Sequence, residues 1–126
     1  MVAIIWIMWA ANGSLLAKNE NLVAEGAKPV KLAGGFKFTE GPAIAPNGDV
    51  YFTDIPNSRV HKWDVKTKKV SLFMEKSGGA NGLFFSKEGD LFACQGESKR
   101  VTSFYLEDGG EKELLADQFD GRPFNK

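Results

Sequence analysis

A repeat with a period of 41 residues constrains this sequence more than any other feature. Residues 40–64 align without a gap on residues 81–105, so that residue i of the first copy corresponds to residue i + 41 of the second. Five of the 25 aligned positions are identical, namely Gly41/Gly82, Gly48/Gly89, Asp49/Asp90, Arg59/Arg100 and Val60/Val101. Identities at turn glycines and within apolar runs indicate that one supersecondary unit occurs twice.

Each copy of the repeat is predicted to form four short strands. The turn signals at residues 47–49 (NGD) and 88–90 (EGD) separate apolar runs and predict tight hairpins. No segment shows a 3.6-residue apolar period, which disfavours a helical or doubly wound fold. The expected strands are residues 42–45, 50–53, 60–64 and 69–74 in the first copy, and 83–86, 91–94, 101–106 and 113–116 in the second.

A four-strand repeat of about 40–45 residues is typical of a β-propeller blade. A blade buries its faces by stacking on neighbours around an axis, and rings close with roughly 4–8 blades. Residues 30–126 therefore predict an all-β fold, a partial β-propeller of about two four-stranded blades. We expect a fragment, a truncated gene model or a protomer whose ring needs further copies, and the stop within the loop at Lys126 favours the fragment.

Composition excludes several classes of function. Sixteen Lys and Arg balance sixteen Asp and Glu, which argues against nucleic-acid binding because such proteins carry a basic excess. The single cysteine, Cys94, excludes an internal disulfide framework and a cysteine-rich zinc site. The single histidine, His61, excludes a histidine-cluster metal site.

The N-terminus is expected to be separate from the fold. Residues 2–11 form an uninterrupted apolar run, which is too short for a stable membrane span of about 20 residues. We interpret residues 1–17 as a signal peptide, residues 18–29 as a linker, and the protein as secreted or periplasmic. No Lys or Arg precedes the run, so a buried first strand and a wrongly assigned start codon remain alternatives.

Polar side chains recur where the innermost strand of each predicted blade begins. Glu40 and Asn81 occupy this position in successive copies, and Asn125 is a third equivalent after a longer loop. Innermost strands start near the propeller axis, so these oxygen-bearing side chains are expected to converge. One carboxylate with several amide oxygens suits a hard divalent cation such as Ca²⁺.

Five motifs resemble the SMP-30/gluconolactonase (LRE-like) family, over residues 30–126. They are residues 38–42 (FTEGP), residues 50–55 (VYFTDI), Arg59, residues 63–64 (WD) and residues 80–83 (ANGL). The resemblance implies a six-bladed propeller and a metal-dependent hydrolase of sugar lactones, with relatives acting on other lactones or organophosphates. It implies Ca²⁺, or alternatively Zn²⁺, as the metal and Glu40 as its ligand.

The resemblance also implies where the other functional residues lie. The remaining ligands, an Asn and an Asp that doubles as the general base, are expected beyond Lys126, so no catalytic residue is expected within this chain. Residues 122–125 (RPFN) resemble the start of a substrate-contacting segment, although their spacing departs from the R-F-N-D form. Asn81, Arg122 and Asn125 are thus the candidate substrate-binding residues.

Two other functions stay open beside the lactonase. The chain could belong to a non-catalytic propeller that serves as a binding platform, since the fold alone licenses no activity. It could also be a non-functional truncation. Several conspicuous residues are expected to be structural: a loop cap (Asp54), inter-blade pairing (Arg59, Arg100), a small buried strand residue (Cys94), a structural or exposed histidine (His61) and blade packing (Trp63, Phe104).

Overall fold

The computed structural model describes residues 24–124. The predicted signal peptide, residues 18–23 of the predicted linker, and Asn125 lie outside the described residues. Residues from 31 onward belong to one compact unit, and residues 24–30 are exposed. In the described part of the chain, no helix combines the length and the apolar character needed to cross a membrane.

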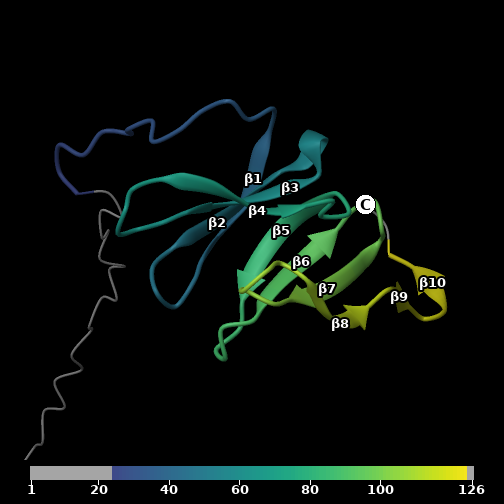
Figure 1. Ribbon diagram of the computed structural model, residues 1–126. Helices are drawn as coiled ribbons and strands as arrows, with labels where there is room; N and C mark the ends of the chain where they lie inside the picture. Colours follow the sequence, from purple (N-terminus) through teal and green to yellow (C-terminus); the bar gives the residue numbers. More distant parts are fainter. Residues whose placement is uncertain (1–23, 125–126) are drawn as a thin grey trace, which may run out of the picture. The chain divides into compact units, whose positions relative to one another are not determined.

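Two four-stranded antiparallel sheets make up the fold (Figure 1). The first sheet has the order β1-β2-β3-β4, with strands Thr39–Ile44, Val50–Asp54, Arg59–Trp63 and Val70–Glu75. The second has the order β5-β6-β7-β8, with strands Ala80–Phe85, Leu91–Gln95, Arg100–Phe104 and Glu111–Ala116. Each sheet is a meander of neighbouring strands, which is the construction of a propeller blade. The all-β, partial-propeller prediction is therefore confirmed.

The 41-residue repeat extends to every strand boundary. Each strand of the second sheet begins and ends 41 residues after its counterpart in the first. The inner strands β1 and β5 both begin three residues before the predicted start, and both contain a bulge, between Glu40 and Ala43 and between Ala80 and Leu83. The pattern in the sequence underestimates the length of these strands because glycine and proline are depleted in regular strands, whereas a bulge accommodates them.

Two short elements were not predicted. The 3₁₀ turn η1 (Ile55–Asn57) connects β2 to β3. A two-stranded hairpin follows the second sheet and consists of β9 (Gln118–Phe119) and β10 (Arg122–Pro123). Strands of two residues have no detectable apolar periodicity, so their sequence is typical of a loop.

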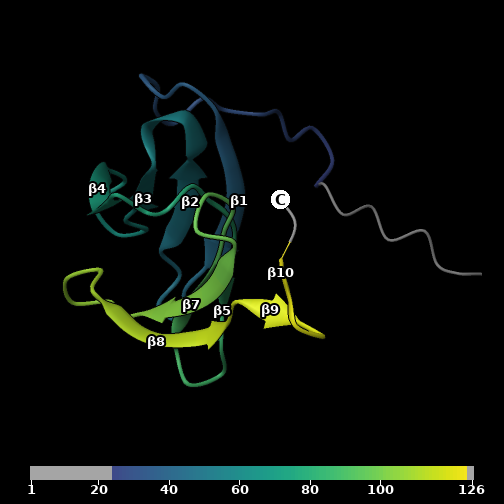
Figure 2. The ribbon, with the colours of Figure 1, turned by 90° about the vertical axis from the view of Figure 1, so that its right-hand side faces the viewer.

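The core lies between the two sheets. The buried residues Tyr51, Val60 and Met74 of the first sheet belong to one cluster with Ala80, Leu91, Ala93 and Phe104 of the second. The ring of Tyr51 packs edge-on against Phe73 and Phe85, at centroid distances of 4.9 and 5.2 Å. The inner strands β1 and β5 lie next to each other in this arrangement (Figure 2). The expected packing role of Phe104, which is 5% exposed, is confirmed.

The opposite face of the first sheet is covered by the segment that precedes β1. Phe36 packs against Phe52 and His61, with ring centroids 5.1 and 4.9 Å away. His61 is half-buried, and burial lowers the pKa of its imidazole. The expected structural role of His61 agrees with this aromatic cluster.

The prediction that Cys94 is buried was wrong, because its side chain is exposed. Its counterpart Thr53 is fully buried, since the second sheet covers that face of the first. The described residues place no further sheet against the corresponding face of the second sheet. Equivalent positions in the repeat therefore have different environments.

The prediction of inter-blade pairing for Arg59 and Arg100 was also wrong. Arg59 forms an ion pair with Glu75 at 3.1 Å, and Arg100 forms one with Glu111 at 2.7 Å. Both pairs join neighbouring strands of one sheet. Arg59 stands directly opposite Glu75 in the antiparallel register, and this places these two charges within reach of each other.

Candidate metal-binding site

Glu40 of β1 and Asn81 of β5 lie on adjacent inner strands with exposed side chains. The fully buried hydroxyl of Thr53 lies 3.0 Å from the carbonyl oxygen of Glu40 and 3.1 Å from that of Asn81. A hydroxyl donates one proton, so Thr53 bonds to one carbonyl at a time and holds both within reach. The backbones of the two candidate residues are thus brought together.

We expect Thr53→Val to lower the free energy of unfolding by about 1 to 3 kcal/mol, because it removes a donor shared by two carbonyls in a buried place. Thr53→Ser keeps the hydroxyl and is expected to cost about 1 kcal/mol or less. Urea unfolding of the two variants measures the difference. Equal losses for valine and serine would show that the methyl group, and not the hydroxyl, is what matters.

Gly41 allows the two inner strands to approach each other closely. Its φ is +53°, and a β-carbon added at this position would lie 1.9 Å from the carbonyl oxygen of Asn81. Any side chain there would overlap the neighbouring backbone. Gly82, its counterpart on β5, has no atom within 4 Å of such a β-carbon. Glycine is therefore required at position 41, where the backbones of β1 and β5 come close together, whereas a side chain would find open space at position 82.

Asp54 ends β2 and anchors the segment that leads to Glu40. Its carboxylate, 1% exposed, accepts hydrogen bonds from the backbone amides of Lys37 (3.2 Å) and Phe38 (3.0 Å) and from the side chain of Asn57 (2.7 Å). Burial by itself raises the pKa of the Asp54 carboxyl, but these hydrogen bonds outweigh burial and hold the pKa below its ordinary value. The predicted structural role of Asp54 is confirmed.

Gln95 ends β6 at the position equivalent to Asp54. Its Nε2 donates to the carbonyl oxygen of Ser77 at 2.8 Å, in the segment that leads to Asn81. Its Oε1 accepts from Arg100 Nε and from the hydroxyl of Thr102, both at 2.8 Å. The sequence signal for this pairing was a polar residue at the same position of both copies, directly after an apolar run.

The donor chemistry at the two inner strands fits a hard cation in part. A carboxylate from Glu40 and an amide oxygen from Asn81 are the ligand types that Ca²⁺ accepts. Ca²⁺ takes 6–8 oxygens, more than these two side chains supply. Within residues 24–124, no group of three or more His, Cys, Asp or Glu side chains is arranged to hold a metal. Glu40 and Asn81 would therefore be part of a larger ligand set.

The other two candidate residues lie towards the end of the chain. Arg122 is exposed on β10, opposite Phe119. Phe124, two residues after Arg122, helps to line a cavity of about 760 Å³ together with Asn81, Gly82 and Cys94. The chain therefore returns from the outer strand β8 towards the inner strand β5. Neither Glu40 nor Arg122 lines this cavity.

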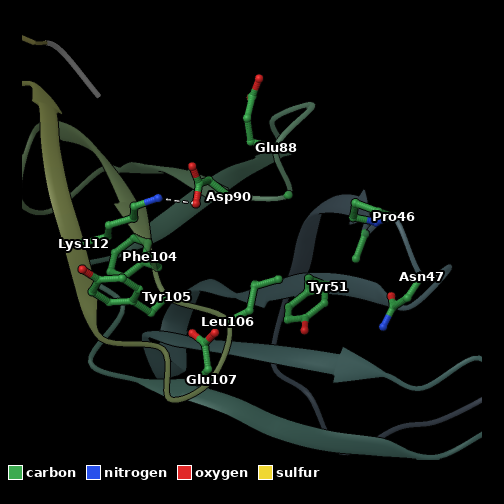
Figure 3. Close-up of a pocket in the computed structure, with 12 residues that line it drawn as sticks. Pro46, Asn47, Tyr51, Glu88, Asp90, Phe104, Tyr105, Leu106, Glu107 and Lys112 are labelled. Atoms are coloured by element: carbon green, nitrogen blue, oxygen red, sulfur yellow. Dashed lines mark hydrogen bonds and ion pairs between the residues drawn. The ribbon is translucent and has the colours of Figure 1, made fainter.

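A second cavity, of about 460 Å³, lies beside the hairpin turns that follow β1 and β5. Figure 3 shows its lining, with Asp90 and Lys112 joined by an ion pair of 2.6 Å. Pro46 and Asn47 of the first turn and Glu88 of the second contribute to its wall. None of the predicted site residues lines it, so it is separate from the candidate metal site.

This chain is similar to known proteins both in sequence and in fold. The family model described as the SMP-30/Gluconolactonase/LRE-like region matches residues 38–126. A provisionally named gluconolactonase of known structure is 36% identical, with a TM-score of 0.70, and the alignment covers 79% of this chain and 34% of that one. No curated protein matches the sequence.

Two further structures share the fold. A gluconolactonase from Xanthomonas campestris is 22% identical with a TM-score of 0.67, covering 73% of this chain and 30% of that one. Regucalcin from Agrobacterium tumefaciens, a calcium-binding protein, is 19% identical with a TM-score of 0.58, covering 68% and 32%. The chain thus spans about a third of the length of these solved relatives.

Proposed function

Because this chain belongs to the SMP-30/gluconolactonase/LRE-like family, we propose that the complete protein is a metal-dependent hydrolase of sugar lactones. The observation that carries the proposal is the placement of Glu40. Its exposed carboxylate stands on an inner strand, in the matched region, beside the equivalent position of the next blade. The two blades described here would supply part of the site, and the remaining blades would supply the rest.

Ca²⁺ is the proposed metal, with Zn²⁺ as the alternative, and calcium binding by a protein of the same fold supports this choice. A bound divalent cation supplies a Lewis acid that polarises a carbonyl oxygen and lowers the pKa of a coordinated water. Glu40 would hold the cation through its carboxylate. The general base would come from a later part of the protein, beyond Lys126.

Three polar residues are proposed to bind the substrate. Asn81 would offer an amide to the lactone or to the cation, from the strand next to Glu40. Arg122, which is exposed on β10, and Asn125 would offer hydrogen bonds to sugar hydroxyls. We also propose that residues 1–17 are a signal peptide, which would place the protein outside the cytoplasm.

The test is Glu40→Gln in the complete protein. We expect the affinity for Ca²⁺, measured by calorimetry, to fall by roughly 100-fold, because a neutral amide replaces the charged ligand. The kcat/KM for gluconolactone should fall in parallel. Glu113→Gln on β8 makes the same chemical change at another exposed position and should leave both quantities unchanged.

Two outcomes would contradict the proposal. Unchanged Ca²⁺ affinity and unchanged hydrolysis in Glu40→Gln would remove this residue from the site. Binding of Ca²⁺ through Glu40 without hydrolysis of any sugar lactone would instead favour a non-catalytic propeller that serves as a binding platform.

A further inference from the structure

We propose that Asp54 is a positioning residue for Glu40, and that the last residue of the second strand has this task in both blades. The inference rests on the proposed function, since it concerns the same metal ligand. Asp54 does not reach the metal in this proposal. It fixes the backbone from which Glu40 projects.

The hydrogen bonds around Asp54 hold the backbone just before Glu40. One carboxylate oxygen accepts from the amide of Phe38, two residues before Glu40, at 3.0 Å. Both oxygens accept from the amide of Lys37, at 3.2 and 3.3 Å. The carbonyl oxygen of Phe38 in turn accepts from the amide of Ile55 at 3.1 Å. The start of β1 is therefore tied to the end of β2 by side-chain and backbone bonds together.

The carboxylate of Asp54 is itself held in place. Asn57 Nδ2 donates to Asp54 Oδ2 at 2.7 Å, and Asn57 belongs to the short turn η1 that begins directly after Asp54. The side chain of Asp54 is 1% exposed, so water does not compete for its oxygens. A buried acceptor with three hydrogen-bonding partners has one favourable orientation, and it transmits that orientation to the amides it binds.

The same anchoring recurs in the second blade. Gln95 stands 41 residues after Asp54 and binds the carbonyl of Ser77, four residues before Asn81. The direction of the hydrogen bonds is reversed between the blades. In the first blade the side chain of Asp54 accepts from backbone amides, and in the second the side chain of Gln95 donates to a backbone carbonyl. In both blades the last residue of the second strand nevertheless binds the backbone just before the inner strand, although the residues bound differ by one to two positions in the repeat. Two different hydrogen-bonding solutions at one position indicate that holding this segment is the shared requirement.

The need for such an anchor follows from the position of β1. It is the inner strand, and it bears a bulge between Glu40 and Ala43 where the ladder with β2 is interrupted. The backbone around Glu40 thus has fewer ladder bonds than a regular strand. Outer-shell groups that orient a metal ligand are typically worth 10–100-fold in metal affinity.

The test compares Asp54→Ala with Asp54→Asn in the complete protein. Calorimetric titration with Ca²⁺ should show roughly a 10-fold loss of affinity for alanine. Asparagine retains an oxygen that can accept from the amides of Lys37 and Phe38, so its loss should stay within about 3-fold. In the metal-free protein, hydrogen exchange at these two amides should become faster in Asp54→Ala and change much less in Asp54→Asn.

Two further variants separate positioning from simple loss of stability. Leu91→Ala removes a fully buried side chain of the second sheet and should leave Ca²⁺ affinity unchanged despite its lower stability. Asn57→Ala removes the donor that orients the Asp54 carboxylate and should weaken Ca²⁺ binding by roughly 2- to 5-fold. This variant also provides the test if Asp54→Ala does not fold.

The outcomes distinguish this inference from the proposed function. If Glu40→Gln abolishes Ca²⁺ binding while Asp54→Ala leaves affinity and amide exchange unchanged, only the positioning role is overturned. Equal losses in Asp54→Asn and Asp54→Ala would assign the effect to the charge of Asp54 instead of its hydrogen bonds, and would also overturn it. If Glu40→Gln leaves Ca²⁺ binding unchanged, the proposed metal site itself fails.

Discussion

Gly41→Ala is expected to lower the free energy of unfolding by roughly 3 to 5 kcal/mol. Two costs add at this residue. The backbone φ of +53° is unfavourable for a side chain, and the new methyl group would meet the carbonyl oxygen of Asn81 at 1.9 Å. Backbone atoms cannot rotate away as a flexible side chain could, so the inner strands of the two blades must separate.

Gly82→Ala is the matched control for this prediction. Gly82 occupies the same position of the second blade, its φ lies outside the left-handed region, and no atom lies within 4 Å of the place that the new methyl group would take. We expect a change within about 1 kcal/mol, because alanine costs little where neither space nor φ forbids it. Urea unfolding of both variants gives the comparison. Similar losses for the two substitutions would contradict the close approach of β1 and β5 described here.

Leu91→Ala is expected to cost about 3 to 5 kcal/mol of the free energy of unfolding. Leu91 is 0% exposed and belongs to the core cluster between the sheets, together with Phe104 on the neighbouring strand. Truncation removes buried apolar surface and leaves a cavity between two sheets whose backbones are already in contact. The surrounding side chains relax only in part, so part of this cavity remains.

The control for Leu91→Ala makes the same substitution on an edge strand. Leu114 of β8 is 45% exposed, so Leu114→Ala should cost about 1 kcal/mol or less. Thermal or urea unfolding of the two variants tests the prediction. A large loss at Leu114 with a small one at Leu91 would contradict the burial of Leu91 in the core between the two sheets.

Much of the fold could be predicted because the repeat is visible in one sequence. Turn glycines and alternating apolar runs depend on local backbone geometry, and the same local rules apply to both copies. The strand order followed, since neighbouring strands joined by short turns pair with each other. The two-residue strands β9 and β10 carry no such pattern, and the structure alone revealed them.

The candidate site was predictable only in outline. The sequence placed Glu40 and Asn81 at equivalent positions of two blades, and the structure shows their backbones joined through Thr53. A polar residue directly after an apolar run marks Asp54 and Gln95 in both copies, but nothing in the spacing showed which backbone groups they bind. Such contacts depend on how a loop folds back over a strand end, which no periodic pattern encodes.

Thr53 and Cys94 show most directly what sequence and structure each decide. The repeat places the two residues at the same position of equivalent strands, β2 and β6, and on the same side of their sheets. The sequence alone determined this much about the protein. Thr53 is nevertheless fully buried and Cys94 is exposed, because the second sheet lies over Thr53, whereas Cys94 lines an open cavity together with Phe124. Local rules are properties of a segment, whereas burial and hydrogen bonding depend on the neighbour that packs against it, and only the tertiary structure supplies that neighbour.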